Sequence, residues 1–257
     1  MGTYTGTSAN DTITPTSIST GVARSPAGTF PSNGADTIYG NAGTDMLIAG
    51  GGSDLVYGGD GNDTIYGKTQ GLADANDGDQ IYGGRGNDII YGNGGEQDTG
   101  SPDGNDTIYG QDGDDRLYGK LGNDVLYGGI GNDFVAGYTG NDTHHGEDGN
   151  DFIRGGDGLD HIYGGSGNDT FDYDMVSHSR AGSSYRDVIH DFGGIGNSST
   201  VTDKIDLTTI DAIAGGSDNA FTFRGTGGFT GNGQVRVAGS GADTVIQVKH
   251  RRQHRHR

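Results

Sequence analysis

The stretch Gly58–Tyr66 reads Gly-Gly-Asp-Gly-Asn-Asp-Thr-Ile-Tyr, and close copies occupy Gly83–Tyr91 and Gly155–Tyr163. The last aspartate of this unit returns along the chain, mostly at nine-residue steps, at Asp36, Asp45, Asp54, Asp63, Asp79, Asp88, Asp106, Asp115, Asp124, Asp133, Asp142, Asp151, Asp160 and Asp169. A carboxylate that recurs at this period within glycine-rich sequence cannot form an ordinary apolar core. The period instead predicts a repetitive coil whose cohesion comes from bound cations.

Composition narrows the class of protein. The 257 residues suffice for one large domain or two small ones, yet only 30% are hydrophobic and 54 are glycine. Such low apolar content would indicate disorder, but a disordered chain has no reason to keep a strict period. The formal net charge of -19 argues against nucleic acid as a partner and favours cations. We find no cysteine, no apolar window long enough for a transmembrane segment, and no conventional signal peptide in the sequence.

Each nine-residue unit divides into a six-residue turn and a three-residue strand. Glycine permits the positive φ angles of a tight turn, and the middle residue of the strand points inward while its neighbours point outward. The predicted inward residues are Ile38, Leu47, Val56, Ile65, Ile81, Ile90, Ile108, Leu117, Leu126, Val135, Ile153, Ile162 and Phe171. Nearly all are bulky or β-branched, which suits stacked parallel strands.

We therefore expect an all-β fold, a right-handed parallel β-roll in which two units, or eighteen residues, make one turn. Aspartates eighteen residues apart then face each other along each edge. One edge is predicted to carry Asp88, Asp106, Asp124, Asp142 and Asp160, the other Asp115, Asp133, Asp151 and Asp169, and shorter columns pair Asp36 with Asp54 and Asp45 with Asp63. Stacked carboxylates repel unless a cation separates them, and hard oxygen ligands favour Ca²⁺. The pairs predict about nine calcium ions, whose charge would nearly neutralise the protein.

Residues 34–173 resemble the calcium-binding nonapeptide repeats of the RTX family, the hemolysin-type β-roll. The resemblance implies that the repeated aspartates, Asp79 included, bind Ca²⁺ together with backbone carbonyls of the turn. The implied carbonyls lie near the glycine two residues before each aspartate, at Gly34, Gly43, Gly52, Gly61, Gly86, Gly104, Gly113, Gly122, Gly131, Gly140, Gly149, Gly158 and Gly167. The alternative is a metal-free solenoid in which the aspartates only shape the turns.

Several positions depart from the pattern. Lys68–Gly78 and Gly94–Asp103 break the period, and we expect both to form surface loops. In the second loop Gln97 takes the aspartate position, which predicts a weak or lost site. His144 takes an inward position, where a transition-metal site and a tolerated packing defect are both open. The tyrosines that follow the inward residues should stack in ladders on the outer faces, where they stabilise the sheets or contact sugars or a membrane.

The segments on either side of the repeats lead to further predictions. Residues 1–33 are expected to be a lead-in segment with one stray repeat at Asn10–Ile13, and residues 34–174 the roll. Short strands and glycine turns in residues 175–248 predict a C-terminal antiparallel β-cap. This segment resembles the C-terminal part of serralysin-type metalloproteases and secreted alginate epimerases, which implies recognition by a type I secretion exporter. Residues 249–257 form a basic tail that departs from the apolar, acidic ending typical of those proteins.

Catalytic motifs are missing from the sequence. It contains no His-Glu-x-x-His zinc motif, Ser-nucleophile elbow, phosphate-binding loop or dinucleotide fingerprint, so we expect no enzyme. The sequence predicts a secreted, extracellular calcium-binding protein that folds on binding calcium and serves as a structural, adhesive or export module. An extracellular polysaccharide or a cell surface is a candidate partner. The alternative is an accessory domain of a larger secreted metalloprotease or polysaccharide-modifying enzyme.

Overall fold

The computed structural model describes residues 2–14, 23–25, 31–69, 78–95, 103–173, 187–192, 203–206, 222–223, 234–240 and 243–249. Some sequence predictions concern residues outside these ranges: the position of Gln97, most of the two period-breaking loops, parts of the lead-in and cap segments, and residues 250–257 of the basic tail. No helix within the described ranges has the length and apolar character needed to cross a membrane.

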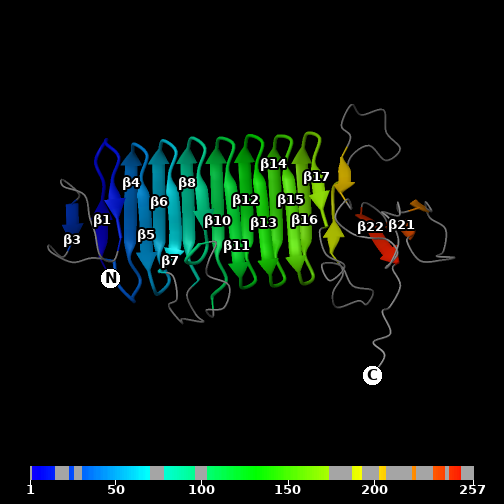
Figure 1. Cartoon of the computed structure of the whole chain (residues 1–257), viewed down its shortest axis with the longest axis horizontal. Coiled ribbons are helices and arrows are strands. Elements are labelled where there is room, and N and C mark those ends of the chain that lie inside the picture. Colours follow the sequence, from blue (N-terminus) through cyan, green and yellow to red (C-terminus); the bar gives the residue numbers. More distant parts are fainter. Residues whose placement is uncertain are drawn as a thin grey trace, which may run out of the picture.

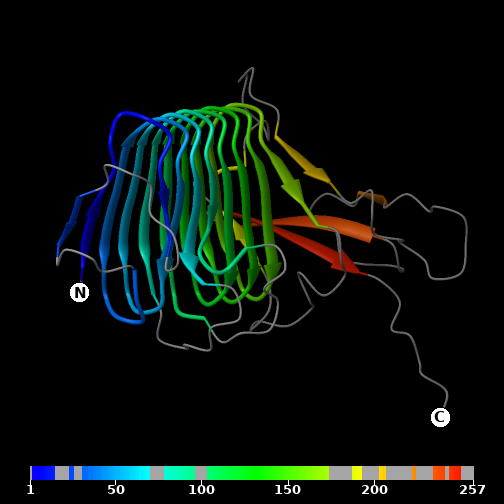
Figure 2. The same ribbon diagram turned by 60° about the vertical axis from the view of Figure 1, so that its left-hand side comes forward.

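The chain winds into a parallel β-roll made of two sheets, seen from the side in Figure 1 and obliquely in Figure 2. In spatial order, the 13-stranded sheet contains β20 (Thr222–Phe223), β21 (Gln234–Ser240), β22 (Asp243–Lys249), β18 (Val188–Ile189), β16 (His161–Ser166), β14 (Thr143–Asp148), β12 (Val125–Ile130), β10 (Thr107–Asp112), β8 (Gln80–Arg85), β6 (Leu55–Asp60), β4 (Thr37–Ala42), β1 (Thr3–Thr5) and β3 (Ala23–Ser25). The 9-stranded sheet contains β19 (Lys204–Asp206), β17 (Thr170–Asp172), β15 (Phe152–Asp157), β13 (Phe134–Thr139), β11 (Arg116–Leu121), β9 (Ile89–Tyr91), β7 (Thr64–Lys68), β5 (Met46–Gly50) and β2 (Thr12–Ile13). Consecutive strands from β4 to β19 alternate between the sheets, as two strands per turn require.

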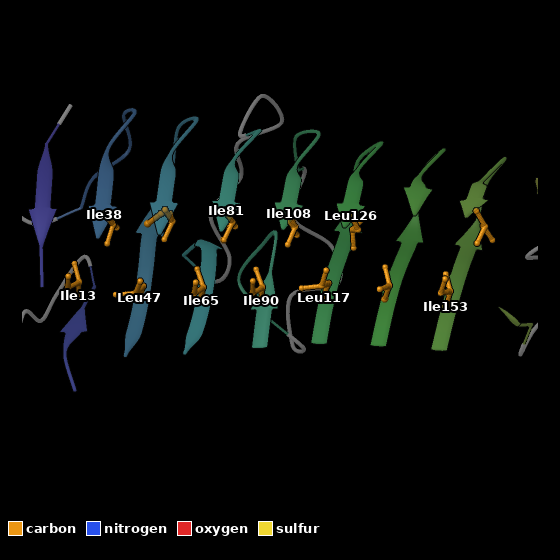
Figure 3. Packing of buried hydrophobic residues seen from close by; sticks show 14 of the residues in the cluster. Ile13, Ile38, Leu47, Ile65, Ile81, Ile90, Ile108, Leu117, Leu126 and Ile153 are labelled. Carbon is orange, nitrogen blue, oxygen red and sulfur yellow. The ribbon is translucent and has the colours of Figure 1, made fainter. Parts of the chain in front are cut away.

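The core is a double row of apolar side chains between the two sheets (Figure 3). Every inward residue predicted from the repeat is buried with no exposed surface, which confirms the assignment of the strand face. The strand register places apolar residues next to each other on neighbouring strands: Ile108 lies beside Leu126 in one sheet, and Leu117 beside Val135 in the other. The roll thus has a core only one side chain deep in each sheet, which leaves the turns to provide the remaining cohesion.

The two period-breaking loops lie between strands of different sheets. One follows β7 and precedes β8, and the other follows β9 and precedes β10. Neither loop interrupts the sheets, because β6 pairs with β8, β8 with β10, β7 with β9 and β9 with β11 in the register of the repeats. The pairing of the described strands therefore continues in register across both insertions.

The parallel sheets continue beyond the predicted limits of the roll. At the N-terminal end, β1 pairs in parallel with β4, and β2 with β5. At the other end, β18 pairs in parallel with β16, and β19 with β17. The prediction that β18 and β19 belong to an antiparallel cap is therefore wrong. Both Asp187–Ile189 and Asp203–Ile205 keep the Asp-x-Ile pattern of the repeat, and they add a further turn.

An antiparallel element does close this end. β21 and β22 pair antiparallel over their full length, and β22 pairs antiparallel with β18 at Ile189 and Thr244. The predicted antiparallel cap is confirmed for β21 and β22, but it is wrong for β20, which pairs with β21 in parallel. The division of the chain into separate domains stays a prediction.

Aromatic rings form a continuous ladder on the outer face of the larger sheet. Each ring stacks on the next with centroids 4.3 to 5.1 Å apart, in the order Tyr39, Tyr57, Tyr82, Tyr109, Tyr127, His145, Tyr163 and His190. A shorter ladder of Tyr66, Tyr91 and Tyr118 lies on the other sheet. Cross-strand ring pairs of this kind stabilise a sheet, so the predicted tyrosine ladders are confirmed.

Candidate metal-binding columns

Hydrogen bonds join the repeated aspartates into two columns along the roll. The backbone N–H of each aspartate donates to Oδ1 of the aspartate one turn further on, at 2.6 to 3.1 Å. Column A contains Asp36, Asp54, Asp79, Asp106, Asp124, Asp142, Asp160 and Asp187. Column B contains Asp11, Asp45, Asp63, Asp88, Asp115, Asp133, Asp151, Asp169 and Asp203.

One predicted pair is wrong. Asp88 and Asp106 are eighteen residues apart, but Asp88 bonds to Asp115 in column B and Asp106 bonds to Asp79 in column A. Asp88 precedes β9 and Asp106 precedes β10, which lie in different sheets, so this interval covers half a turn rather than a full one. Other neighbouring pairs within the uninterrupted repeats are as predicted. The structure adds pairs that bridge the loops, such as Asp54 with Asp79.

Three column members were missed as candidate ligands by the reasoning from sequence. Asp11, Asp187 and Asp203 continue the columns at their ends. The signal that could have found them is the Asp-Thr-Ile or Asp-x-Ile triplet at each position, which survives where the flanking glycines are lost.

The carboxylates in the columns are buried. The fourteen aspartates predicted as ligands are at most 3% exposed. Oδ1 is used by the ladder, whereas the buried Oδ2 has no hydrogen-bond partner in Asp45, Asp63, Asp88, Asp115, Asp124, Asp133, Asp142, Asp151 and Asp169. A buried carboxylate oxygen without a partner is costly, and so many of them in register indicate a missing positive partner.

Backbone carbonyls lie beside these oxygens. A Cβ atom added to Gly128 would stand 2.6 Å from the Gly146 carbonyl oxygen and closer still to Oδ2 of Asp133, so both oxygens face one small space. The same arrangement recurs around Gly83, with Oδ2 of Asp88 and the Gly110 carbonyl. These carbonyls belong to the glycine that follows the aromatic position, a set that the sequence reasoning did not single out.

The carbonyls predicted as ligands occupy a second position. The carbonyl oxygen of Gly113 lies where a side chain on Gly131 would begin, and Gly131 in turn has this relation to Gly149. Gly131 has a φ of +142° and Gly149 one of +154°. Only glycine therefore allows the turns to stack this closely, which explains its recurrence two residues before the aspartate. Ligation by these carbonyls stays a prediction.

Burial makes the charged form of these carboxyls unfavourable in the protein by itself. Desolvation raises the pKa of Asp142 to about 9, and repulsion from Asp124 and Asp160 adds to the shift. Desolvation likewise raises the pKa of Asp88 to about 8 and that of Asp133 to about 7, again with repulsion from column neighbours. At neutral pH these groups need either a proton or a metal cation.

The donor set fits calcium. The described residues contain no group of three or more His, Cys, Asp or Glu side chains placed to hold a metal ion, so backbone carbonyls must complete each site. Carboxylate and carbonyl oxygens are the ligands of Ca²⁺, while zinc and copper sites use imidazole and thiolate. In both columns, the Oδ2 atoms that lack a hydrogen-bond partner would bind Ca²⁺ together with the neighbouring carbonyl oxygen.

A second hydrogen-bonded ladder runs along the turns and was missed from the sequence. Where asparagine precedes the aspartate in successive turns, its side chain accepts a bond from the next turn: the N–H of Asn141 donates to Oδ1 of Asn123 at 2.8 Å, and the N–H of Leu159 donates to Oδ1 of Asn141 at 2.9 Å. The recurrence of Asn at this position of the repeat is the signal. This ladder is exposed and fixes the rim of the turns outside the carboxylates.

His144 lies inward as predicted. Its side chain is fully buried, and neither ring nitrogen has a hydrogen-bond partner. Burial lowers the pKa of His144 to about 3, so the imidazole is neutral at physiological pH. The neighbouring His145 instead stacks between Tyr127 and Tyr163 on the outer face.

Comparison with protein families matches the RTX calcium-binding nonapeptide repeat in four copies, at residues 32–65, 75–96, 103–126 and 136–171. No curated protein matches the chain. The matched stretches carry most of both aspartate columns, and none falls on residues 175–248, whose resemblance to serralysins and epimerases stays a prediction. The parallel β-roll of this chain is therefore built from RTX calcium-binding nonapeptide repeats.

Proposed function

We propose that the protein is a secreted, non-catalytic calcium-binding module whose roll folds when calcium binds outside the cell. The observation that carries this proposal is the series of buried Oδ2 atoms, in both columns, that have no hydrogen-bond partner. In a chain with net charge -19, this arrangement leaves strong repulsion along both edges of the roll. Calcium supplies the charge that the columns lack.

Binding and folding are coupled because the columns exist only in the folded roll. Where calcium is scarce, as in the cytosol, the carboxylates repel and the thin apolar core cannot compensate, so the chain stays unfolded. An unfolded chain suits passage through a type I exporter, as is typical of proteins with RTX repeats. Outside the cell, calcium stabilises the folded state by mass action, with affinities on the order of 10⁻⁴–10⁻³ M expected for an extracellular module.

The number of ions follows from the columns. The eighteen-residue spacing predicts about nine sites. The hydrogen-bonded columns add pairs across both loops and at the ends, and they remove the pair Asp88–Asp106. Column A has seven neighbouring pairs and column B has eight, so we expect about fifteen ions if each neighbouring pair holds one.

Far-ultraviolet circular dichroism during a calcium titration tests the proposal. β-Sheet signal should appear cooperatively as calcium rises, and an equal concentration of Mg²⁺ should fail to induce it, because Mg²⁺ demands a stricter octahedral site. Calorimetry on the same samples gives the stoichiometry. A β-sheet spectrum that is the same in calcium and in chelator would overturn coupled folding.

A structural or adhesive role is favoured by the long aromatic ladder on the larger sheet. Flat, half-exposed rings at a regular spacing offer a stacking surface to polysaccharide rings at a cell surface. A glycan array probed at saturating calcium tests this role, and replacement of Tyr82 and Tyr109 by Thr should abolish any signal. A protein that binds no glycan, and whose gene neighbour encodes a metalloprotease, epimerase or lyase needing it to fold or be exported, would instead support the accessory-domain alternative.

A further inference from the structure

His144 departs from the chemistry of its row. In the larger sheet it lies in register between Leu126 and Ile162, in a core row that is otherwise apolar. The side chain is fully buried, and both Nδ1 and Nε2 lack a hydrogen-bond partner. A buried imidazole without partners is unfavourable, so a role in packing alone does not account for it.

Nε2 of His144 and one of the column carboxylates lie beside the same glycine. A Cβ atom added to Gly137 would lie 2.7 Å from His144 Nε2, 2.7 Å from the Gly155 carbonyl oxygen, and closer still to Asp142 Oδ2. These three atoms therefore surround one small space at the turn between β13 and β14. Oδ2 of Asp142 is itself buried and without a partner.

In two other turns, a carbon atom of the core side chain borders the equivalent space. Around Gly58, the atoms nearest a Cβ are the Gly83 oxygen, Oδ2 of Asp63, and Cδ1 of Ile65 at 3.2 Å. Around Gly164, Cζ of Phe171 takes that position at 2.9 Å. The turn at Asp142 thus has the same two oxygen atoms, but an imidazole nitrogen replaces the carbon atom as their neighbour.

We propose that this turn is a separate site for a nitrogen-preferring divalent metal of the zinc class, held by His144 Nε2, Asp142 Oδ2 and the Gly155 carbonyl oxygen. Neutral imidazole is a common ligand of Zn²⁺, Cu²⁺ and Ni²⁺, whereas Ca²⁺ prefers oxygen. A mixed nitrogen and oxygen set with a carboxylate suits Zn²⁺. The inference goes beyond calcium-dependent folding, which the other turns would support without this site.

The test follows the histidine nitrogens directly. The full chain, labelled with ¹⁵N in its histidines, is refolded from chelator with saturating calcium, with and without one equivalent of Zn²⁺. Zinc should move the Nε2 resonance of His144 to the position of a metal-bound nitrogen and leave its Nδ1 resonance little changed. An Nε2 resonance that is unaffected by zinc in a folded, calcium-loaded protein overturns the proposal.

Two variants provide the matched comparison. His144→Leu places in the row the same residue as Leu126 one turn earlier, so the roll should still fold with calcium. It should lose the tightest zinc-binding event in calorimetry, with affinity at least tenfold weaker. His145→Tyr, which keeps an aromatic ring at this position of the outer ladder, should bind zinc as the parent does. Equal zinc affinity in His144→Leu and the parent contradicts the site. Circular dichroism in calcium, recorded first, shows whether calcium-dependent folding has failed independently.

Discussion

The backbone N–H of Asp124 donates a 2.8 Å hydrogen bond to Oδ1 of Asp142, one turn further along the roll. The bond fixes the Asp142 carboxylate so that its other oxygen, Oδ2, is buried beside a glycine carbonyl and has no hydrogen-bond partner. Because the relation repeats along both columns, the turns are joined by bonds that also align the carboxylates. The same geometry that orders the metal-free turns therefore concentrates negative charge in them.

Acid should partly replace calcium. The pKa of Asp124 is raised to about 8, that of Asp133 to about 7 and that of Asp142 to about 9, against an ordinary value of 3.8. Between pH 3.8 and these values the folded chain keeps protons that the unfolded chain has released. Raising the pH through this window therefore destabilises the metal-free roll, and lowering it stabilises the roll.

We accordingly expect the chain in EGTA to gain β-sheet signal in circular dichroism as the pH falls from about 7 to about 4. In saturating calcium the dependence should reverse, because protons compete with the metal for the same oxygens. A metal-free chain whose β-sheet content falls on acidification over this range would contradict the assignment of the buried carboxyls.

Asp133→Asn should have opposite effects with and without calcium. The amide keeps an oxygen that can accept the N–H of Asp115, but it removes one buried charge from column B. In calcium we expect an affinity lower by about tenfold or more and a lower denaturation midpoint. In chelator the variant should fold more readily than the parent. Asp148→Asn, which removes an exposed charge, is the control and should change both properties much less. Destabilisation of the Asp133 variant under both conditions would mean that the carboxylate acts only as a hydrogen-bond acceptor.

Gly131→Ala tests the close stacking of the turns. Gly131 has a φ of +142°, and a Cβ there would collide with the Gly113 carbonyl oxygen. We expect the calcium-loaded roll to lose at least about 1–3 kcal/mol of unfolding free energy from backbone strain alone. Gly34→Ala is the control, since nothing lies within 4 Å of a Cβ at that position. Urea unfolding in calcium measures both, and equal stability of the two variants would refute the stacking contact.

Lys68 acts as a fixed cation where the loops interrupt the roll. Its Nζ lies 3.2 Å from Oδ1 of Asp103, and both side chains are fully buried. Lys68→Met leaves the Asp103 carboxylate buried without this charge, and we expect a loss of about 3–5 kcal/mol in calcium. Arg85→Met removes only exposed ion pairs with Asp60 and Asp112, and should cost about 0–1 kcal/mol. Urea unfolding that gives similar losses for both variants would contradict a structural role for Lys68.

The repeat predicts the fold well because each inward residue, from Ile38 to Phe171, follows an aspartate by two positions in the sequence. The period gives both the strand and its buried face. It cannot show how long a loop is, however. The interval from Asp88 to Asp106 equals one turn in residues but half a turn in space.

The ends of the roll were harder to predict for a different reason. Asp187 and Asp203 continue the columns after the glycine turns have stopped, so the periodic signal is reduced to a single triplet. The environment of His144 was also beyond the sequence alone. Its proximity to Oδ2 of Asp142 depends on the opposite strand at Gly137, which the spacing of the repeat does not reveal.

Small-angle X-ray scattering of the chain at neutral pH, in chelator and then in saturating calcium, tests the central claim most directly. For 257 residues, a compact fold has a radius of gyration of about 18 Å and an unfolded chain one of about 56 Å. We predict an expanded chain in EGTA that contracts to the compact value on addition of calcium. A compact particle of unchanged dimensions in EGTA at neutral pH would contradict the claim that cations between the aspartate columns hold the roll together.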